Sequence, residues 1–104
     1  MGAIDMVNHI VLWNFRQELT AQERENAGRI ICESLNAVKE KAKGVIRLEV
    51  RINELSSSSK DIALISCFDS EDALNAYQIH PEHVKAAAYI KTVTCERACF
   101  DYKA

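Results

Sequence analysis

Apolar and polar residues recur along the chain with two different periods. A period of two predicts a strand, and the helical period predicts an amphipathic helix. Segments with a period of two are predicted strands, at 7–15, 45–53, 61–68 and 92–102. The first of them is apolar on both faces, which is typical of a strand that is covered on each side. The second alternates apolar side chains with Arg47, Glu49 and Arg51, which indicates a half-exposed strand near a sheet edge.

Helical segments fill the intervals between these strands. The sequence Thr-Ala-Gln-Glu at 20–23 is a capping-box pattern that begins a helix, and Gly44 supplies the left-handed residue that ends it. Ser70 is the expected N-cap of a short helix. Pro81, preceded by His80, is well placed as the first residue of another short helix.

The order of these segments is strand, helix, strand, strand, helix, strand, with the two short helices counted as one. This order predicts an α+β fold, ferredoxin-like βαββαβ, with a four-stranded antiparallel sheet. The helices can cover only one face of such a sheet. We expect the other face to carry the apolar row Val7, Val11, Trp13 and Phe15, which is too apolar to face water. Two sheets packed face to face would cover both rows and form a homodimer, a dimeric α/β barrel.

Composition and charge narrow the class of protein. A length of 104 residues fits one domain, which we place at 7–104 after a flexible tail at 1–6. The net charge of −2, without a basic cluster, argues against nucleic acid or an anionic membrane as a partner. No apolar stretch approaches the roughly 20 residues needed to span a bilayer. The four cysteines form no C-x-x-C pair, and we expect reduced thiols in a cytoplasmic protein.

Histidine and tyrosine are the side chains here that can move protons or hold an oxygen near neutral pH. Tyr77, His80 and His83 lie around Pro81, which must bend the chain. His9 lies inside an apolar strand, where a polar ring needs a reason. Burial disfavours a charged ring, so His9 is either a neutral proton acceptor in a cavity or a core histidine bonded to the backbone.

The other candidate side chains have structural alternatives as well. His83 faces either a cavity or solvent, and Tyr77 either anchors its helix to the sheet or binds a substrate carbonyl. His80 is expected as a structural cap beside Pro81. His9, His80 and His83 together would be a zinc ligand set, but His-x-x-His across a helix start is weak evidence. The sequence therefore predicts no metal site and no cofactor.

Three motifs resemble the stress-responsive dimeric α/β-barrel family, abbreviated Dabb. The segment 7–13, Val-Asn-His-Ile-Val-Leu-Trp, is similar to the opening strand of the family. The segment 70–83 ends in Tyr-x-x-His-Pro-x-His and is similar to the second family signature, while Phe-Asp-Tyr at 100–102 matches its last strand. The resemblance covers nearly the whole chain, and it implies a homodimeric α+β barrel with a pocket between sheet and helices.

Within that family the chain resembles plant polyketide cyclases. In those enzymes a first-strand histidine, the tyrosine before His-Pro and the histidine after it contribute to an aldol-type ring closure. By position they are His9, Tyr77 and His83, which are therefore the candidate catalytic residues. A further pocket tyrosine of those enzymes falls near Ile31 here. The candidate ligand-binding residues are Val11, Trp13, Ile31 and His80.

Three functions are compatible with these features. The favoured one is binding of a small apolar or aromatic molecule in a His/Tyr-lined pocket, with acid–base chemistry of the lyase or cyclase kind. The second is a non-catalytic, stress-protective homo-oligomer. The third is a haem-degrading monooxygenase, since Trp13 and Asn14 are residue types that such enzymes use on this fold, although at another spacing. A cavity of roughly a few hundred Å³ with converging polar groups would favour the first.

Overall fold

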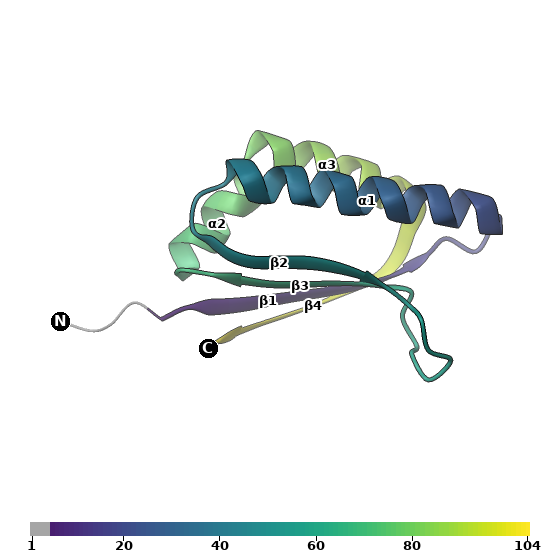
Figure 1. Cartoon of the computed structure of the whole chain (residues 1–104), viewed down its shortest axis with the longest axis horizontal. Coiled ribbons are helices and arrows are strands. Elements are labelled where there is room, and N and C mark those ends of the chain that lie inside the picture. Colours follow the sequence, from purple (N-terminus) through teal and green to yellow (C-terminus); the bar gives the residue numbers. More distant parts are fainter. Residues whose placement is uncertain (1–4) are drawn as a thin grey trace.

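The structure is a computed structural model that describes residues 5–104, in which one antiparallel sheet carries all the helices on a single face (Figure 1). Its elements are β1 (Val7–Phe15), α1 (Ala21–Lys41), β2 (Val45–Ile52), β3 (Ile62–Phe68), α2 (Glu71–Ile79), α3 (Pro81–Val93) and β4 (Thr94–Lys103). The strand order is β2-β3-β1-β4, with every pair antiparallel. The ferredoxin-like α+β prediction is thereby confirmed.

The prediction of a flexible tail at 1–6 falls mainly on residues 1–4, which lie outside the described part of the chain. Asp5 and Met6 are described and exposed. The backbone carbonyl of Met6 accepts a hydrogen bond of 2.9 Å from the amide of Ala104, so the first described residues run beside the end of β4. None of the helices within residues 5–104 is long and apolar enough to cross a membrane.

Local sequence signals begin each helix where they predict it. The Thr20 hydroxyl accepts from the amide of Glu23 at 3.1 Å, and the Glu23 carboxylate accepts from the amide of Thr20 at 2.8 Å, which completes the capping box of α1. Ser70 caps α2 through a bond of 3.1 Å from the amide of Ala73. These bonds satisfy amides that have no partner inside the helix.

Gly44 is required between α1 and β2 for two reasons. Its φ of +79° lies in the left-handed region, where a side chain is strained. A Cβ built there would lie 2.7 Å from the Cβ of Ala73, closer than two carbon atoms can pack. The predicted helix stop is thus also the point at which α2 crosses the start of β2.

The orientation of β1 differs from the one predicted from sequence. Val7, Val11, Trp13 and Phe15 do not form the uncovered face; they are buried between the sheet and the helices, together with His9. That interpretation was wrong because both faces of β1 are apolar, so alternation alone could not tell which one the helices cover. These four side chains belong to the hydrophobic core together with buried residues of α1 and α3.

The uncovered side of the sheet, here called the open face, instead carries the other set of β1 side chains. Its apolar centre crosses β3, β1 and β4, and its largest members are Ile10, Leu12, Ile65, Phe100 and Tyr102. Phe100 and Tyr102 are 66% and 45% exposed. An apolar area of this kind on a strand face is typical of an interaction surface.

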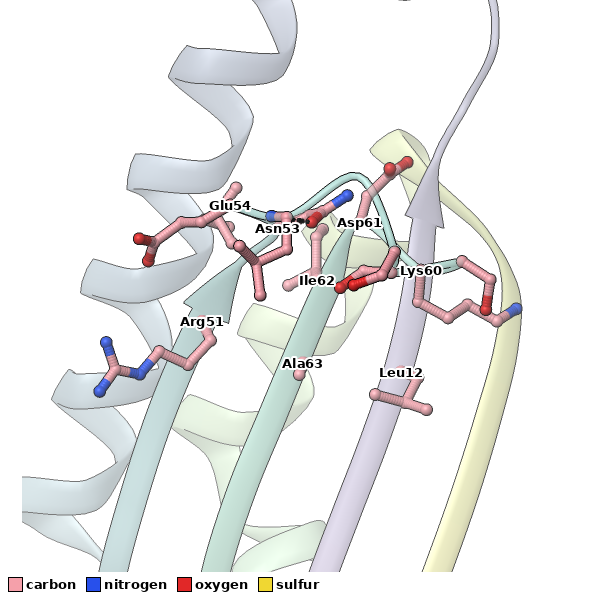
Figure 2. Close-up of a pocket in the computed structure, with 13 residues that line it drawn as sticks. Leu12, Arg51, Asn53, Glu54, Lys60, Asp61, Ile62 and Ala63 are labelled. Carbon is pink, nitrogen blue, oxygen red and sulfur yellow. Dashed lines mark hydrogen bonds between the residues drawn. The ribbon is translucent and has the colours of Figure 1, made fainter.

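A charged strand borders the open face, as the alternation in β2 predicts. β2 lies at a sheet edge, and the carboxylate of Glu49 binds both Arg47, at 2.7 Å, and Arg51. The loop between β2 and β3 projects to the same side, away from the helices (Figure 1). It forms an open groove of about 660 Å³ with Leu12 and Ala63 (Figure 2). The described residues that line this groove include no histidine, tyrosine or cysteine.

β4 begins two residues later than predicted, because α3 continues to Val93. Its register against β1 shifts between Leu12 and Asn14, and Glu96 has a φ of +53° at this irregularity. Beyond it, Asp101 lies directly opposite His9 in the neighbouring strand. The irregularity thus sets which β4 side chain reaches the buried histidine.

Candidate functional site

A cavity of about 420 Å³ lies between the sheet and the helices. Its apolar lining residues come from β1, α1, β3 and α3 and are Val11, Trp13, Leu35, Leu64, Ala87 and Ile90. Its polar lining residues are His9, Gln78, His83, Lys91 and Arg97. A largely apolar cavity of this size with a few converging polar groups is typical of a small-molecule site.

His9 lines this cavity, and one of its ring nitrogens is hydrogen-bonded to another side chain. Its ring is 2% exposed, and Nδ1 lies 2.5 Å from Oδ1 of Asp101. A carboxylate accepts, so Nδ1 carries the hydrogen and Nε2 keeps its lone pair. The backbone carbonyl of His9 accepts a further bond of 2.7 Å from the Ser66 hydroxyl. His9 is thus a buried histidine whose orientation is fixed and whose Nε2 can accept a proton.

His83 reaches the same cavity from α3 in the same tautomer. Its Nδ1 lies 3.0 Å from the backbone carbonyl of Gln78, which can only accept, so Nε2 is again the free nitrogen. Burial lowers the pKa of His83 from its ordinary value, while the bond to Gln78 acts in the opposite direction. The neighbouring His9, Arg97 and His80 lower this pKa further. At neutral pH the His83 ring is therefore uncharged.

Tyr77 packs behind His83 and does not line the cavity. Its ring is fully buried, with centroids 4.6 Å from His83 and 4.8 Å from Phe68. Burial raises the pKa of Tyr77 well above its usual range, so the phenol keeps its proton. Among residues 5–104 its hydroxyl has no hydrogen-bond partner. The tyrosine therefore holds the His83 ring in place by packing, with one polar atom left for a further contact.

The remaining predicted ligand-binding residues divide into two groups. Val11 and Trp13 line the cavity. Ile31 is fully buried in the core on α1 and is not among the lining residues. His80 is the N-cap of α3, where its Nδ1 accepts from the amide of Glu82 at 3.1 Å, and it also lies outside the lining.

Four polar residues of the site were not predicted. Gln78 and Lys91 are placed by their helices, Arg97 by the irregular start of β4, and Asp101 by the β1–β4 register. The one available signal was the strand motif Phe-Asp-Tyr at 100–102, in which the acidic residue shares a face with Cys99. The sequence alone does not show that Asp101 pairs with His9 on β1, because this contact follows from the β1–β4 register.

Two alternatives from the sequence do not match the geometry. The three histidines do not converge on one ligand set, because His80 caps α3 outside the cavity that His9 and His83 line. The haem comparison needs Trp13 and Asn14 in one pocket, yet they point to opposite faces of β1. Asn14 is instead held by Glu96, at 2.9 Å, and by the amide of Asp61, at 3.1 Å.

The cysteine nearest the site is a protonated thiol. Cys99 Sγ lies 3.5 Å from Oδ1 of Asp101 and 3.8 Å from Nδ1 of His9. Burial raises the pKa of the Cys99 thiol and the Asp101 carboxylate raises it further, while Arg97 acts in the opposite direction. A thiol that keeps its proton is a poor nucleophile, so this geometry supports acid–base chemistry at the histidines and not covalent catalysis.

Solved structures with the same ferredoxin-like architecture include proteins that are described as dimeric. A dimeric protein of unknown function from Bacteroides fragilis NCTC 9343 is 33% identical, with a TM-score of 0.89, over 95% of this chain and 96% of that chain. A dimeric ferredoxin-like protein from Thermobifida fusca YX is 22% identical, with a TM-score of 0.82, over 97% and 92%. The hydroxynitrile lyase from Passiflora edulis is 13% identical, with a TM-score of 0.77, over 96% and 94%.

The family follows from residues 7–104, which match the model of the stress responsive A/B barrel domain, Dabb. The chain belongs to this family, as its motifs predict. A comparison with curated proteins finds no match.

Proposed function

We propose that the protein binds a small molecule in the 420 Å³ cavity and transfers a proton to or from it with His9 and His83. One observation carries this proposal: both rings line one cavity, and each has Nδ1 engaged, so that each offers Nε2. Two acceptors of this kind beside an apolar wall suit abstraction of a proton next to a carbonyl or from a hydroxyl. Lyase and cyclase reactions both begin in this way.

The two histidines differ in what supports them. Asp101 stabilises a positive charge that forms on His9, as a carboxylate does for a catalytic base. His83 is bonded only to a neutral carbonyl and is surrounded by groups that disfavour its charge. We therefore assign His9 as the proton acceptor and His83 as the group whose Nε2 accepts a hydrogen bond from a substrate hydroxyl and so orients the substrate.

The lining also limits the kind of molecule. Trp13, Leu35 and Leu64 offer an apolar surface for an aliphatic or aromatic body. Lys91 and Arg97 add positive charge to the lining of the same cavity. A ligand with an apolar body and an anionic or enolisable carbonyl end fits both. The hydroxynitrile lyase from Passiflora edulis has the same fold at 13% identity, so this likeness concerns the fold alone.

Native mass spectrometry of the protein from its own cells tests the binding step. We expect a retained molecule of a few hundred daltons, which His9→Gln weakens. The anionic aromatic probe 1-anilinonaphthalene-8-sulfonate gives an independent measurement, because Trp13 is the single tryptophan of the chain and lines the cavity. The probe should quench Trp13 fluorescence. Absence of any retained molecule together with unquenched Trp13 would argue for the non-catalytic alternative.

The assembly we propose is a homodimer joined through the open faces. The apolar centre formed by Ile10, Phe100 and Tyr102 supplies a surface that a second copy would cover. Two relatives described as dimeric share the fold, one of them at 33% identity. The two-fold pairing of one such face with itself satisfies the usual geometry of a homodimer.

A further inference from the structure

We propose that His9, Cys99 and Asp101 form a binding site for a thiophilic divalent cation such as Zn²⁺. One ligand atom from each residue lies within 4.8 Å of the others. The cluster arises from strand geometry: Cys99 and Asp101 are two residues apart on one face of β4, and His9 lies directly opposite Asp101 on β1. Imidazole nitrogen, thiolate sulfur and carboxylate oxygen are the ligands that zinc prefers.

The separations fit such a cation with little movement. Ligands bound at 2.0–2.3 Å in a tetrahedron lie roughly 3.3–3.6 Å apart. Sγ of Cys99 is already 3.5 Å from Oδ1 of Asp101 and 3.8 Å from Nδ1 of His9. Only the distance of 2.5 Å between Nδ1 and Oδ1 must widen, by about 1 Å. Asp101 can supply this movement because its side chain is 41% exposed and β4 lies at the sheet edge.

The charges of the ligands match those of a dication, while Arg97 places a further positive charge near Cys99. A thiolate and a carboxylate together offset its two charges, while His9 binds as a neutral ring. Cys99 gives up its thiol proton to solvent as the metal–sulfur bond forms. The hydrogen on Nδ1 of His9 leaves that nitrogen, and the neutral ring keeps one hydrogen on Nε2. Three protein ligands leave a fourth position open, as in zinc sites that exchange a ligand.

Occupation of this site would reverse the role of His9 in the cavity. With Asp101 as its partner, the ring presents the lone pair of Nε2; with a cation on Nδ1, it presents an Nε2–H donor. A bound cation would therefore remove the proton acceptor of the proposed function. The cation site itself does not depend on that function, because its ligands are defined by geometry alone.

Spectroscopic titration of the chelator-treated protein with Co²⁺ tests the site. We expect one Co²⁺ per chain, with a sulfur-to-metal charge-transfer band that Zn²⁺ abolishes by displacement. Cys99→Ser should remove this band and weaken Zn²⁺ binding by at least the roughly 10–100-fold that loss of an outer-shell partner costs. Cys99 is exposed, so this variant should fold.

Cys95→Ser is the matched control, since Cys95 lies on the same strand and its thiol instead donates to the backbone carbonyl of Phe15 at 3.6 Å. It should bind Co²⁺ as the unmodified protein does. Asp101→Asn should keep the thiolate band at reduced affinity. A titration without a thiolate band, or equal bands in the two cysteine variants, would overturn the cation site and leave the proposed proton transfer untouched.

Discussion

Nδ1 of His9 and Oδ1 of Asp101 lie 2.5 Å apart although 92 positions separate the residues in sequence. Direct pairing of the two residues in the β1–β4 register produces this contact. The equivalent bond of His83 goes to the backbone carbonyl of Gln78, which no substitution can remove. A substitution at Asp101 can therefore change which nitrogen of His9 is free without altering the ring itself.

Asp101→Asn should change the tautomer of His9 while leaving the fold intact. The amide can donate to Nδ1, which moves the ring hydrogen to Nε2 and abolishes the proton acceptor. Any proton-transfer activity should fall by about 100-fold or more. Imidazole ¹⁵N chemical shifts report the tautomer directly, with or without a known substrate. Asp5→Asn is the control, because Asp5 pairs with Lys103, at 3.9 Å, near the same end of the sheet. Unchanged shifts in Asp101→Asn would contradict the orienting role of the carboxylate.

Tyr77→Phe separates packing from ligand contact. The hydroxyl of Tyr77 is buried without a partner among residues 5–104, and such a group costs about 1–3 kcal/mol. Its removal should leave the free energy of unfolding equal or slightly higher, because the ring contacts with Phe68 and His83 remain. Urea denaturation measures this. A clear loss of stability would indicate that the hydroxyl has a structural partner, whereas weaker quenching of Trp13 by the probe would assign it to the ligand.

Stability should depend on pH through His83. The folded pKa of His83 lies below its ordinary value of 6.5, so the unfolded chain binds more protons between the two values. The contribution of this residue is therefore complete above about pH 6.5 and is lost as the pH falls through the folded pKa. Denaturation of the unmodified protein and of His83→Gln at several pH values gives the comparison. Parallel stability curves for the two proteins between pH 7 and 5 would refute it.

Phe100→Asp should dissociate the proposed homodimer without unfolding the chain. Phe100 is 66% exposed on the open face, so a charge there is tolerated by one chain but not inside a desolvated interface. Val84→Asp is the matched control, because Val84 is 55% exposed on α3, on the helix side of the sheet. Light scattering should give a monomer for the first variant and a dimer for the second. If the Phe100→Asp protein remained dimeric, the dimer interface would have to lie on another surface.

Trp13→Asp would not test the dimer, although the predicted place of Trp13 on the uncovered face would make this substitution the obvious choice. Trp13 is 7% exposed and belongs to the core of a single chain. The choice failed because Val7, Val11 and Trp13 on one face of β1, and Ile10 and Leu12 on the other, are both apolar enough to be covered. In β2 one face is apolar and the other carries Arg47 and Arg51, and the structure has the half-exposed edge strand that this pattern predicts.

The candidate site shows the same division between local and long-range information. Helix ends are local, so Thr20, Ser70 and Pro81 were predicted at the positions they occupy. The contact of His9 with Asp101 depends on a strand irregularity at Glu96, which no nearby sequence pattern indicates. The isolation of the Tyr77 hydroxyl depends on side-chain packing between three elements and could not be predicted at all.

The cavity and the open face lie on opposite sides of one sheet. A dimer joined through its open faces would hold the two cavities on its outer sides, each lined by one chain and separated by both sheets. Ligand saturation would then be hyperbolic, and a mixed dimer with one His9→Gln chain would keep half its activity. Substitutions in the pocket need not alter the dimer surface, because successive side chains of a strand point to opposite faces of the sheet.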